Sequence, residues 1–351
     1  MNSFKIYKST FKFTLARILT GLAGVALMVG LPVIAFLLSG GTDDDVLRIG
    51  ICIGAFIVAC ILVGLFKHFV GYCYRAGQIA VSADIIATGN MPQNAFAEGK
   101  AAVKKRFGTV AVFFAIEGII NSIVHQLTSG VSKVADKIGE KTESDTVKAI
   151  GTAVSIIINA MLKFMCSCCM GWVFLHPDTN PWRAACDGAI VYFKNWKGLL
   201  KNTGKVIGLG VLSLALIGGL LFGASHLALH NQSAIVEMSE ELTEFIHENS
   251  AELENAVAEG TEESVSEEDT SKAVKFIENL SASDWRLIFE GLIAIILWSI
   301  LHSSLVDPYI MISVMKRYLT DGLANPPARE TDAKLMGMSK SYKKALAKAG
   351  E

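Results

Sequence analysis

The sequence has few charged residues and lacks the short motifs that mark common enzyme classes. Charged residues make up 19 % of its 351 residues, against about 25 % in typical soluble domains. It contains no phosphate-binding loop, no GxSxG, no HExxH and no dinucleotide-binding fingerprint. We therefore expect that the protein is not an enzyme and that it uses no cofactor and no metal.

Cysteine is too scarce for a disulfide framework. The sequence has 7 cysteines, an odd number, and none of them falls in the acidic segment 231–284. Cys166, Cys168 and Cys169 lie close together, but no His or Cys pair completes a four-ligand zinc site beside them. We expect buried thiols at this cluster, with lipidation as the alternative.

Apolar stretches are what the sequence has in abundance, since 52 % of the residues are hydrophobic and they occur in blocks. A helix needs about 20 apolar residues to cross the hydrocarbon core of a bilayer. The first block follows basic residues but is too long for a signal peptide and lacks a small-residue cleavage site, so we expect none. Six spans are predicted: Ile18–Leu38, Ile49–Phe69, Thr109–Ser129, Ala149–Phe174, Val206–His226 and Leu287–Pro308, the last with an inner end left open as far as Tyr318.

Charge segregation predicts the orientation of these spans, because Lys and Arg prefer short cytoplasmic loops. The N-terminal arm, the connections 70–108 and 175–205, and the C-terminal tail are basic, whereas the loop 231–284 is rich in Glu. With six spans and both termini in the cytoplasm, these basic segments would all lie on the cytoplasmic side and the Glu-rich loop on the opposite side. We expect a multi-pass protein of the plasma membrane, with the lipid bilayer rather than nucleic acid as its partner and with a homo-oligomer left open.

The predicted fold is all-α, a polytopic membrane protein with interfacial cytoplasmic helices and an extracytoplasmic helical hairpin. Residues 71–106 and 182–199 are the predicted interfacial segments, with a re-entrant segment as the alternative for the second. The chain is expected to divide into 1–230 with five spans, the acidic helical loop 231–284, the sixth span 285–318 and a basic cytoplasmic tail 319–351.

The acidic loop is open to two interpretations. Apolar residues from Ile235 to Ile246 follow helical spacing with Glu on the other face, which predicts a solvated helical hairpin. Clustered acids also concentrate cations, so a cation-attracting vestibule is the alternative. Asn231 and Asn279 begin glycosylation sequons on the predicted outer side.

Ionisable residues within the predicted spans are candidates for a transport pathway, because charge at bilayer depth is costly. Glu117 and Lys163 each fall roughly 12–16 Å deep at about 1.5 Å per residue, so we predict that they pair. The pair would either fix helix register or form a proton- or cation-linked site. His125 and Glu290 lie near the outer ends, where we expect them to be hydrated.

His302 and Asp307 complete the set of pathway candidates. His302 lies beside two serines, and we expect it to be a satisfied structural histidine. Asp307-Pro308 is predicted to break the sixth helix, because proline lacks a backbone N–H and restricts the residue before it. The break would be either a hinge or the start of a tail helix.

Several motifs together resemble the choline transporter-like family over roughly residues 105–325. They follow in the family's order and spacing: Arg106-Phe-Gly-Thr-Val-Ala, Phe164-Met-Cys-Ser-Cys-Cys-Met, Leu199-Leu-Lys-Asn-Thr-Gly-Lys-Val, and Val306-Asp-Pro-Tyr with Asp321-Gly322. Lys201 stands where the family has Arg, and the family has more spans, so the resemblance covers a core. It implies a carrier for choline or a related amine.

Three functions remain open from the sequence. A carrier for a small organic cation would hold quaternary nitrogen against aromatic faces, for which Trp172, Trp298 and Tyr309 are the candidates. An oligomeric channel would use the external hairpin as a cap. A non-transporting scaffold or lipid-organising protein would act through its interfacial helices and basic tail.

Overall fold

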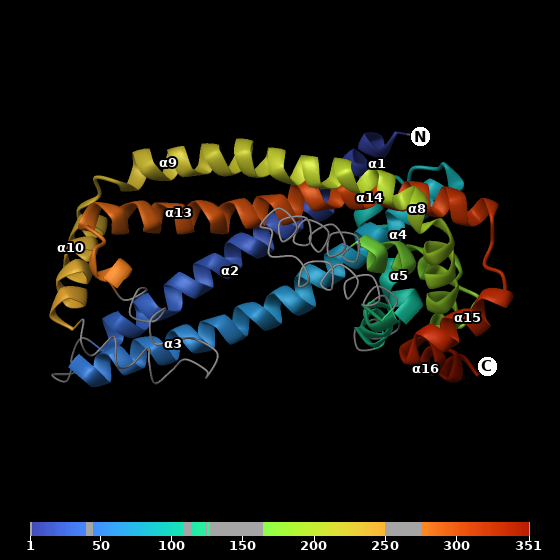
Figure 1. Ribbon diagram of the computed structural model, residues 1–351, viewed down its shortest axis with the longest axis horizontal. Helices are drawn as coiled ribbons and strands as arrows, with labels where there is room; N and C mark the ends of the chain where they lie inside the picture. Colours follow the sequence, from blue (N-terminus) through green and yellow to red (C-terminus); the bar gives the residue numbers. More distant parts are fainter. Residues whose placement is uncertain are drawn as a thin grey trace, which may run out of the picture. The chain divides into compact units, whose positions relative to one another are not determined.

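Every element in the described part of the chain is a helix (Figure 1). The computed structural model describes residues 2–39, 45–107, 112, 114–123, 125–126, 164–249 and 275–350. The chain divides into two compact units, Met1–Gly210 with His302–Glu351, and Val211–Leu301. The all-α prediction is confirmed for the residues that these ranges include.

Four helical runs in the described part are long and apolar enough to cross a membrane. They are Phe11–Leu38, Ile53–Thr88, Gly208–Leu229 and Ala282–Ala324. In the most apolar 18-residue stretch of each run, at most 22 % of the residues are buried. Leu38 and Leu220 are 82 % and 75 % exposed. Helices that show such continuous apolar surface need an apolar solvent, so these are features of a multi-pass membrane protein.

The third and fourth predicted spans are described only in part. Residues Phe114–Ile123 and Phe164–Leu175 form shorter apolar helices, and they fall within Thr109–Ser129 and at the end of Ala149–Phe174. The rest of both segments lies outside the described residues. Six spans therefore remain a prediction.

The second predicted span continues into the segment after it. α3 (Asp45–Phe66), a π-helical turn η2 (Lys67–Gly71) and α4 (Tyr72–Thr88) form one helical run. It ends at Gly89, whose φ of 77° places it in the left-handed region and whose N–H bonds to the Ile85 carbonyl. The sequence correctly predicted this break.

The two predicted interfacial segments differ from expectation, because much of each is buried in protein. In α4, residues Ala76–Ala83 are buried, and the segment 182–199 is the first part of one long helix, α8 (Pro181–Ser213). Ala185, Ile190 and Val191 of that helix are fully buried. No proline separates this segment from the fifth predicted span, so α8 runs on through a π turn η3 (Leu214–Gly218) into α9 (Gly219–Leu229).

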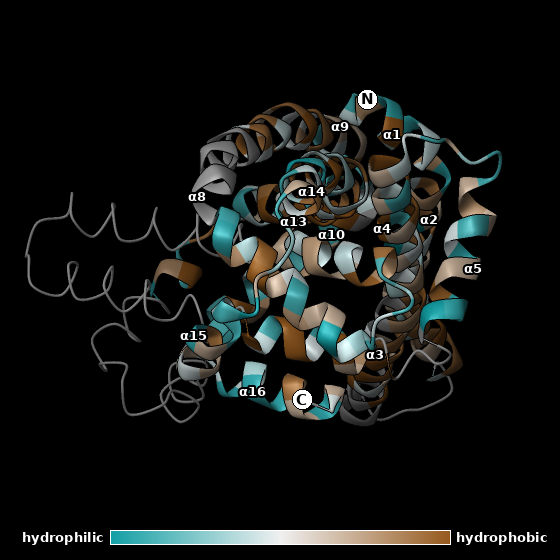
Figure 2. Cartoon of the chain, turned by 90° about the vertical axis from the view of Figure 1, so that its right-hand side faces the viewer, coloured by the Kyte–Doolittle hydropathy of each residue, from teal (hydrophilic) through white to brown (hydrophobic). Residues whose placement is uncertain are grey.

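The larger unit has its core where α4, the helix Phe164–Leu175, α8 and α14 (Asp307–Ala324) meet. α2 (Phe11–Leu38) lies beside α3, and α1 (Ser3–Ser9) packs on α14. α4 and α5 (Ala95–Phe107) cross closely at Gly77 and Gly99. In Figure 2 hydrophobic residues follow α2 and α3, whereas α5 carries hydrophilic ones.

The basic C-terminal tail is folded onto this unit. α15 (Glu330–Met338) and α16 (Lys340–Ala349) place Leu335, Tyr342 and Leu346 against Ile123 and Ile190. Ser339 caps α16 by accepting a hydrogen bond from the N–H of Tyr342.

The smaller unit is a helical hairpin with a third helix. α9 and α13 (Ala282–Leu301) lie side by side, and α10 (Ser233–Glu248) packs on α13 (Figure 1). α10 buries Ile246 and exposes its Glu side chains, so the helix predicted at the start of the acidic loop is confirmed.

Candidate functional site

A π-helical turn interrupts the last long helical run in the larger unit. η4 (His302–Val306) connects directly to α14, so the helix continues across Asp307-Pro308 to Ala324. The predicted break is therefore wrong. Pro308 has no N–H, and its ring would clash with the carbonyl four residues earlier in a regular α-helix. The wider π turn just before Pro308 accommodates the proline, and such turns occur frequently at functional sites.

Charged side chains surround this turn. Arg17 of α2 donates a hydrogen bond to the backbone carbonyl of Ser303. His302 Nε2 lies 3.5 Å from Oδ1 of Asp307, which is 7 % exposed. The negative charge of Asp307 also acts on Arg17. The two predicted candidates on this helix, His302 and Asp307, are thus brought together with an arginine that the sequence analysis did not single out.

A second group of polar contacts lies between α4 and the two shorter apolar helices. Arg75 Nη2 donates to Ser167 Oγ at 2.8 Å. Cys166 Sγ donates to Glu117 Oε1 at 3.6 Å. The charges of Glu117 and Arg75 both act on the Cys166 thiol, and Arg75 acts on Arg17, so the two groups are electrostatically connected.

Together these residues form what we call the charged cluster: Arg17, Arg75, Glu117, Cys166, Ser167, His302 and Asp307. Its formal charge is balanced between two arginines and two carboxylates when His302 is neutral. Such a set within apolar helices is costly to form unless every charge has partners.

The predicted pair between Glu117 and Lys163 is not described, because Lys163 lies outside the described residues. Glu117 is half-buried, and its contact is with the Cys166 thiol. The expectation of buried thiols is confirmed for Cys166, Cys168 and Cys169, each at most 3 % exposed.

The aromatic candidates have separate partners. Trp172 stacks on His176 with ring centroids 4.3 Å apart, and Tyr309 meets Tyr7 edge-on at 6.0 Å. Trp298 belongs to the smaller unit, where it lies beside Gly218.

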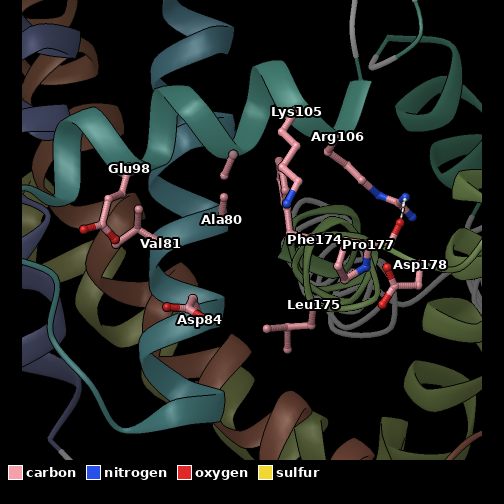
Figure 3. Close-up of a pocket in the computed structure, with 11 residues that line it drawn as sticks. Ala80, Val81, Asp84, Glu98, Lys105, Arg106, Phe174, Leu175, Pro177 and Asp178 are labelled. Atoms are coloured by element: carbon pink, nitrogen blue, oxygen red, sulfur yellow. Dashed lines mark hydrogen bonds between the residues drawn. The ribbon is translucent and has the colours of Figure 1, made fainter.

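A pocket of about 430 Å³ opens between α4, α5 and the end of the helix Phe164–Leu175 (Figure 3). Arg106 forms one side by donating to the carbonyls of Val173, Pro177 and Thr179 at 3.1, 2.9 and 2.8 Å. Burial lowers the pKa of this guanidinium, and the charge of Asp178 opposes the shift. The lining combines apolar and charged residues: Ala80, Val81, Asp84, Glu98, Ala102, Lys105, Arg106, Phe174, Leu175, Pro177 and Asp178.

Glu290 differs from the expectation of a hydrated residue, because its side chain is fully buried in the smaller unit. It lies between His226, in the last turn of α9, and His230, the residue that follows this helix, and their four-residue spacing places both on one face. That spacing is the sequence signal for this site, although neither histidine was among the predicted site residues. Glu290 of α13 is 60 residues from His230 in the sequence, so only the folded chain brings these side chains together.

Comparison with known proteins gives no relative: no family model, curated protein or solved structure matches the chain. The resemblance to the choline transporter-like family therefore depends on the quoted motifs alone.

Proposed function

We propose that this multi-pass membrane protein is a carrier for a small organic cation, such as choline or a related amine. The observation that carries the proposal is the charged cluster, which joins apolar helices at a π-helical turn. Ionisable residues inside membrane helices mark substrate and ion pathways more often than they serve packing alone. The motifs that resemble the choline transporter-like family support the choice of substrate.

Asp307 and Glu117 are the groups that would attract a cation. Asp307 is buried beside His302 and feels the charge of Arg17. A substrate cation entering the cluster would take over part of the role of that arginine, so binding and release would be coupled to a change of partners. The π turn η4 lies directly beside these residues, and such turns occur frequently at functional sites.

Uptake into proteoliposomes tests the proposal directly. We expect purified protein to accumulate labelled choline above the level of empty vesicles. Asp307→Asn should reduce that uptake at least about 10-fold, because the cluster would then hold an uncompensated arginine. Asp321→Asn is the matched control, since Asp321 is on the same helix, its side chain is 41 % exposed, and it pairs with the exposed Arg317.

Other outcomes would contradict the carrier. Uptake equal to that of empty vesicles, or equal loss in both variants, would remove the assignment. Ion conductance without saturable uptake would indicate a channel, and the absence of both would indicate a scaffold or lipid-organising protein.

A further inference from the structure

Three side chains of metal-ligand type converge between α9 and α13 in the smaller unit. His226 Nδ1 lies 2.8 Å from Glu290 Oε2, and His230 Nδ1 lies 2.9 Å from Glu290 Oε1. One ligand atom from each residue lies within 4.8 Å of the others. The two imidazole rings have centroids 4.4 Å apart.

The buried carboxylate of Glu290 needs a positive partner. The Glu290 side chain is 0 % exposed, and a buried carboxylate is costly unless a positive charge accompanies it. Two neutral histidines supply hydrogen bonds but no charge. Two protonated histidines would repel each other, because their ring centroids lie 4.4 Å apart. The compensating charge can come from one protonated histidine or from a metal ion bound by all three side chains.

We propose that His226, His230 and Glu290 bind a divalent transition-metal ion, with Zn²⁺ as the best fit. Two imidazole nitrogens and one carboxylate oxygen are a donor set found in zinc sites, with three protein ligands and an open fourth position. A tetrahedral ion with bonds of about 2.0–2.2 Å needs ligand atoms roughly 3.3 Å apart. The side chains reach that spacing by small rotations, and the ion replaces the protons between the nitrogens and the carboxylate.

The surroundings allow an ion to arrive from water. The side chains of His226 and His230 are 43 % and 29 % exposed, so the site is open on the histidine side. α10, which packs on α13, exposes a row of carboxylates that raises the local concentration of cations: Glu237, Glu240, Glu241, Glu244 and Glu248. Ca²⁺ and Mg²⁺ prefer all-oxygen sites, so the imidazoles select against them.

A bound ion would connect the two long helices of the hairpin at one end. It would also restrict the short turn that follows His230 and leads into α10. The metal site does not depend on the proposed transport function, because it belongs to a different unit from the charged cluster.

Cobalt spectroscopy on the full-length protein tests the site. The protein is purified in detergent with a tag that contains no histidine, stripped with EDTA and titrated with Co²⁺. We expect visible d–d bands typical of four-coordination, which Zn²⁺ then removes and Mg²⁺ does not. His230→Ala should weaken the affinity for Zn²⁺ by at least about 10-fold, the loss that even an outer-shell partner of a metal site can produce.

His247→Ala is the matched control, because His247 is an exposed histidine on α10 of the same unit. It should leave the cobalt spectrum and the Zn²⁺ affinity unchanged. Elution of each variant from a size-exclusion column at the wild-type volume establishes that it is folded. If His230→Ala aggregates, His230→Gln is measured in its place. Absence of d–d bands in the wild type, or equal affinity in the His230 and His247 variants, would overturn the proposal.

Discussion

The hydroxyl of Tyr318 donates a hydrogen bond to the carbonyl oxygen of Gly188 across 2.8 Å, and it joins α14 to α8. Tyr318 is fully buried, and a Cβ atom added at Gly188 would lie 3.2 Å from the Tyr318 hydroxyl and 3.1 Å from Cys169 Cα. The absence of a side chain at Gly188 therefore lets α8, α14 and the helix Phe164–Leu175 approach closely.

Removing the Tyr318 hydroxyl should weaken this junction. We expect Tyr318→Phe to lower the free energy of unfolding by about 1 kcal/mol, the net value of a typical buried hydrogen bond. Thermal unfolding in detergent measures the effect. Tyr309→Phe, on the same helix but half-buried with its ring against Tyr7, is the control, and equal shifts for the two variants would contradict the assignment.

The crossing of α4 and α5 should not tolerate a side chain at Gly99. A Cβ atom there would lie 2.6 Å from the Gly77 carbonyl oxygen and 2.6 Å from Phe13 Cζ. Because the first of these atoms is backbone, Gly99→Ala requires the helices to separate, at a cost of about 1–3 kcal/mol. Gly54→Ala meets no atom within 4 Å, and alanine favours a helix more than glycine does, so this variant should not lower the unfolding temperature.

Local signals in the sequence predicted much of the fold. The break at Gly89, the helix after Ile235 and the apolar runs all follow from residue type and period, which act over short stretches. The continuity of α8 was harder to predict, because charged residues such as Lys194 suggested a separate interfacial segment. The burial of Ala185 and Ile190 depends on helices elsewhere in the chain.

The candidate sites depend even more on contacts between distant residues. Asp307 and His302 could be chosen as polar residues in an apolar stretch, but Arg17 joins them from 286 residues away through Ser303. Glu290 was expected to be hydrated because its position near a helix end was known and its histidine partners were not. The position of a residue in the sequence gives its approximate depth along a membrane helix. Whether its side chain is buried depends on which other helix packs against that face.

The docking of the C-terminal helices should weaken at high pH. Burial, and then the hydrogen bond to Asp332, raise the pKa of Tyr342 above its ordinary value near 10, while the charge of Arg183 opposes the shift. A raised pKa means that the folded state holds the proton more tightly. The stability from this group is therefore complete below about pH 10 and is lost as the pH rises above that value.

Limited proteolysis of α15 and α16 between pH 8 and pH 11 measures this loss. We expect cleavage to increase above about pH 10 in the wild type. Tyr342→Phe should show faster cleavage at all pH values but a smaller increase with pH, since it has no proton to lose. Arg183 also faces Asp332 and Asp187, at 3.1 and 2.7 Å, and its pKa is raised, because both carboxylates outweigh the effect of burial. An equal pH dependence in both proteins would show that the transition does not come from Tyr342, and Arg183 stays charged throughout this pH range.

Arg106 should be irreplaceable by lysine in forming the pocket of Figure 3. Its guanidinium bonds three carbonyl oxygens at once, including that of Val173 in the last turn of the helix Phe164–Leu175. Lysine keeps the charge but has no planar fork, so it cannot hold all three carbonyls in this geometry. We expect Arg106→Lys to increase amide hydrogen exchange over residues 173–180 by about 10-fold, equivalent to roughly 1.4 kcal/mol. Lys105→Arg, which changes a neighbouring residue of the same pocket and also keeps the charge, should leave exchange in that segment unchanged. An increase of similar size in this control would show that the effect is not specific to the three hydrogen bonds of Arg106.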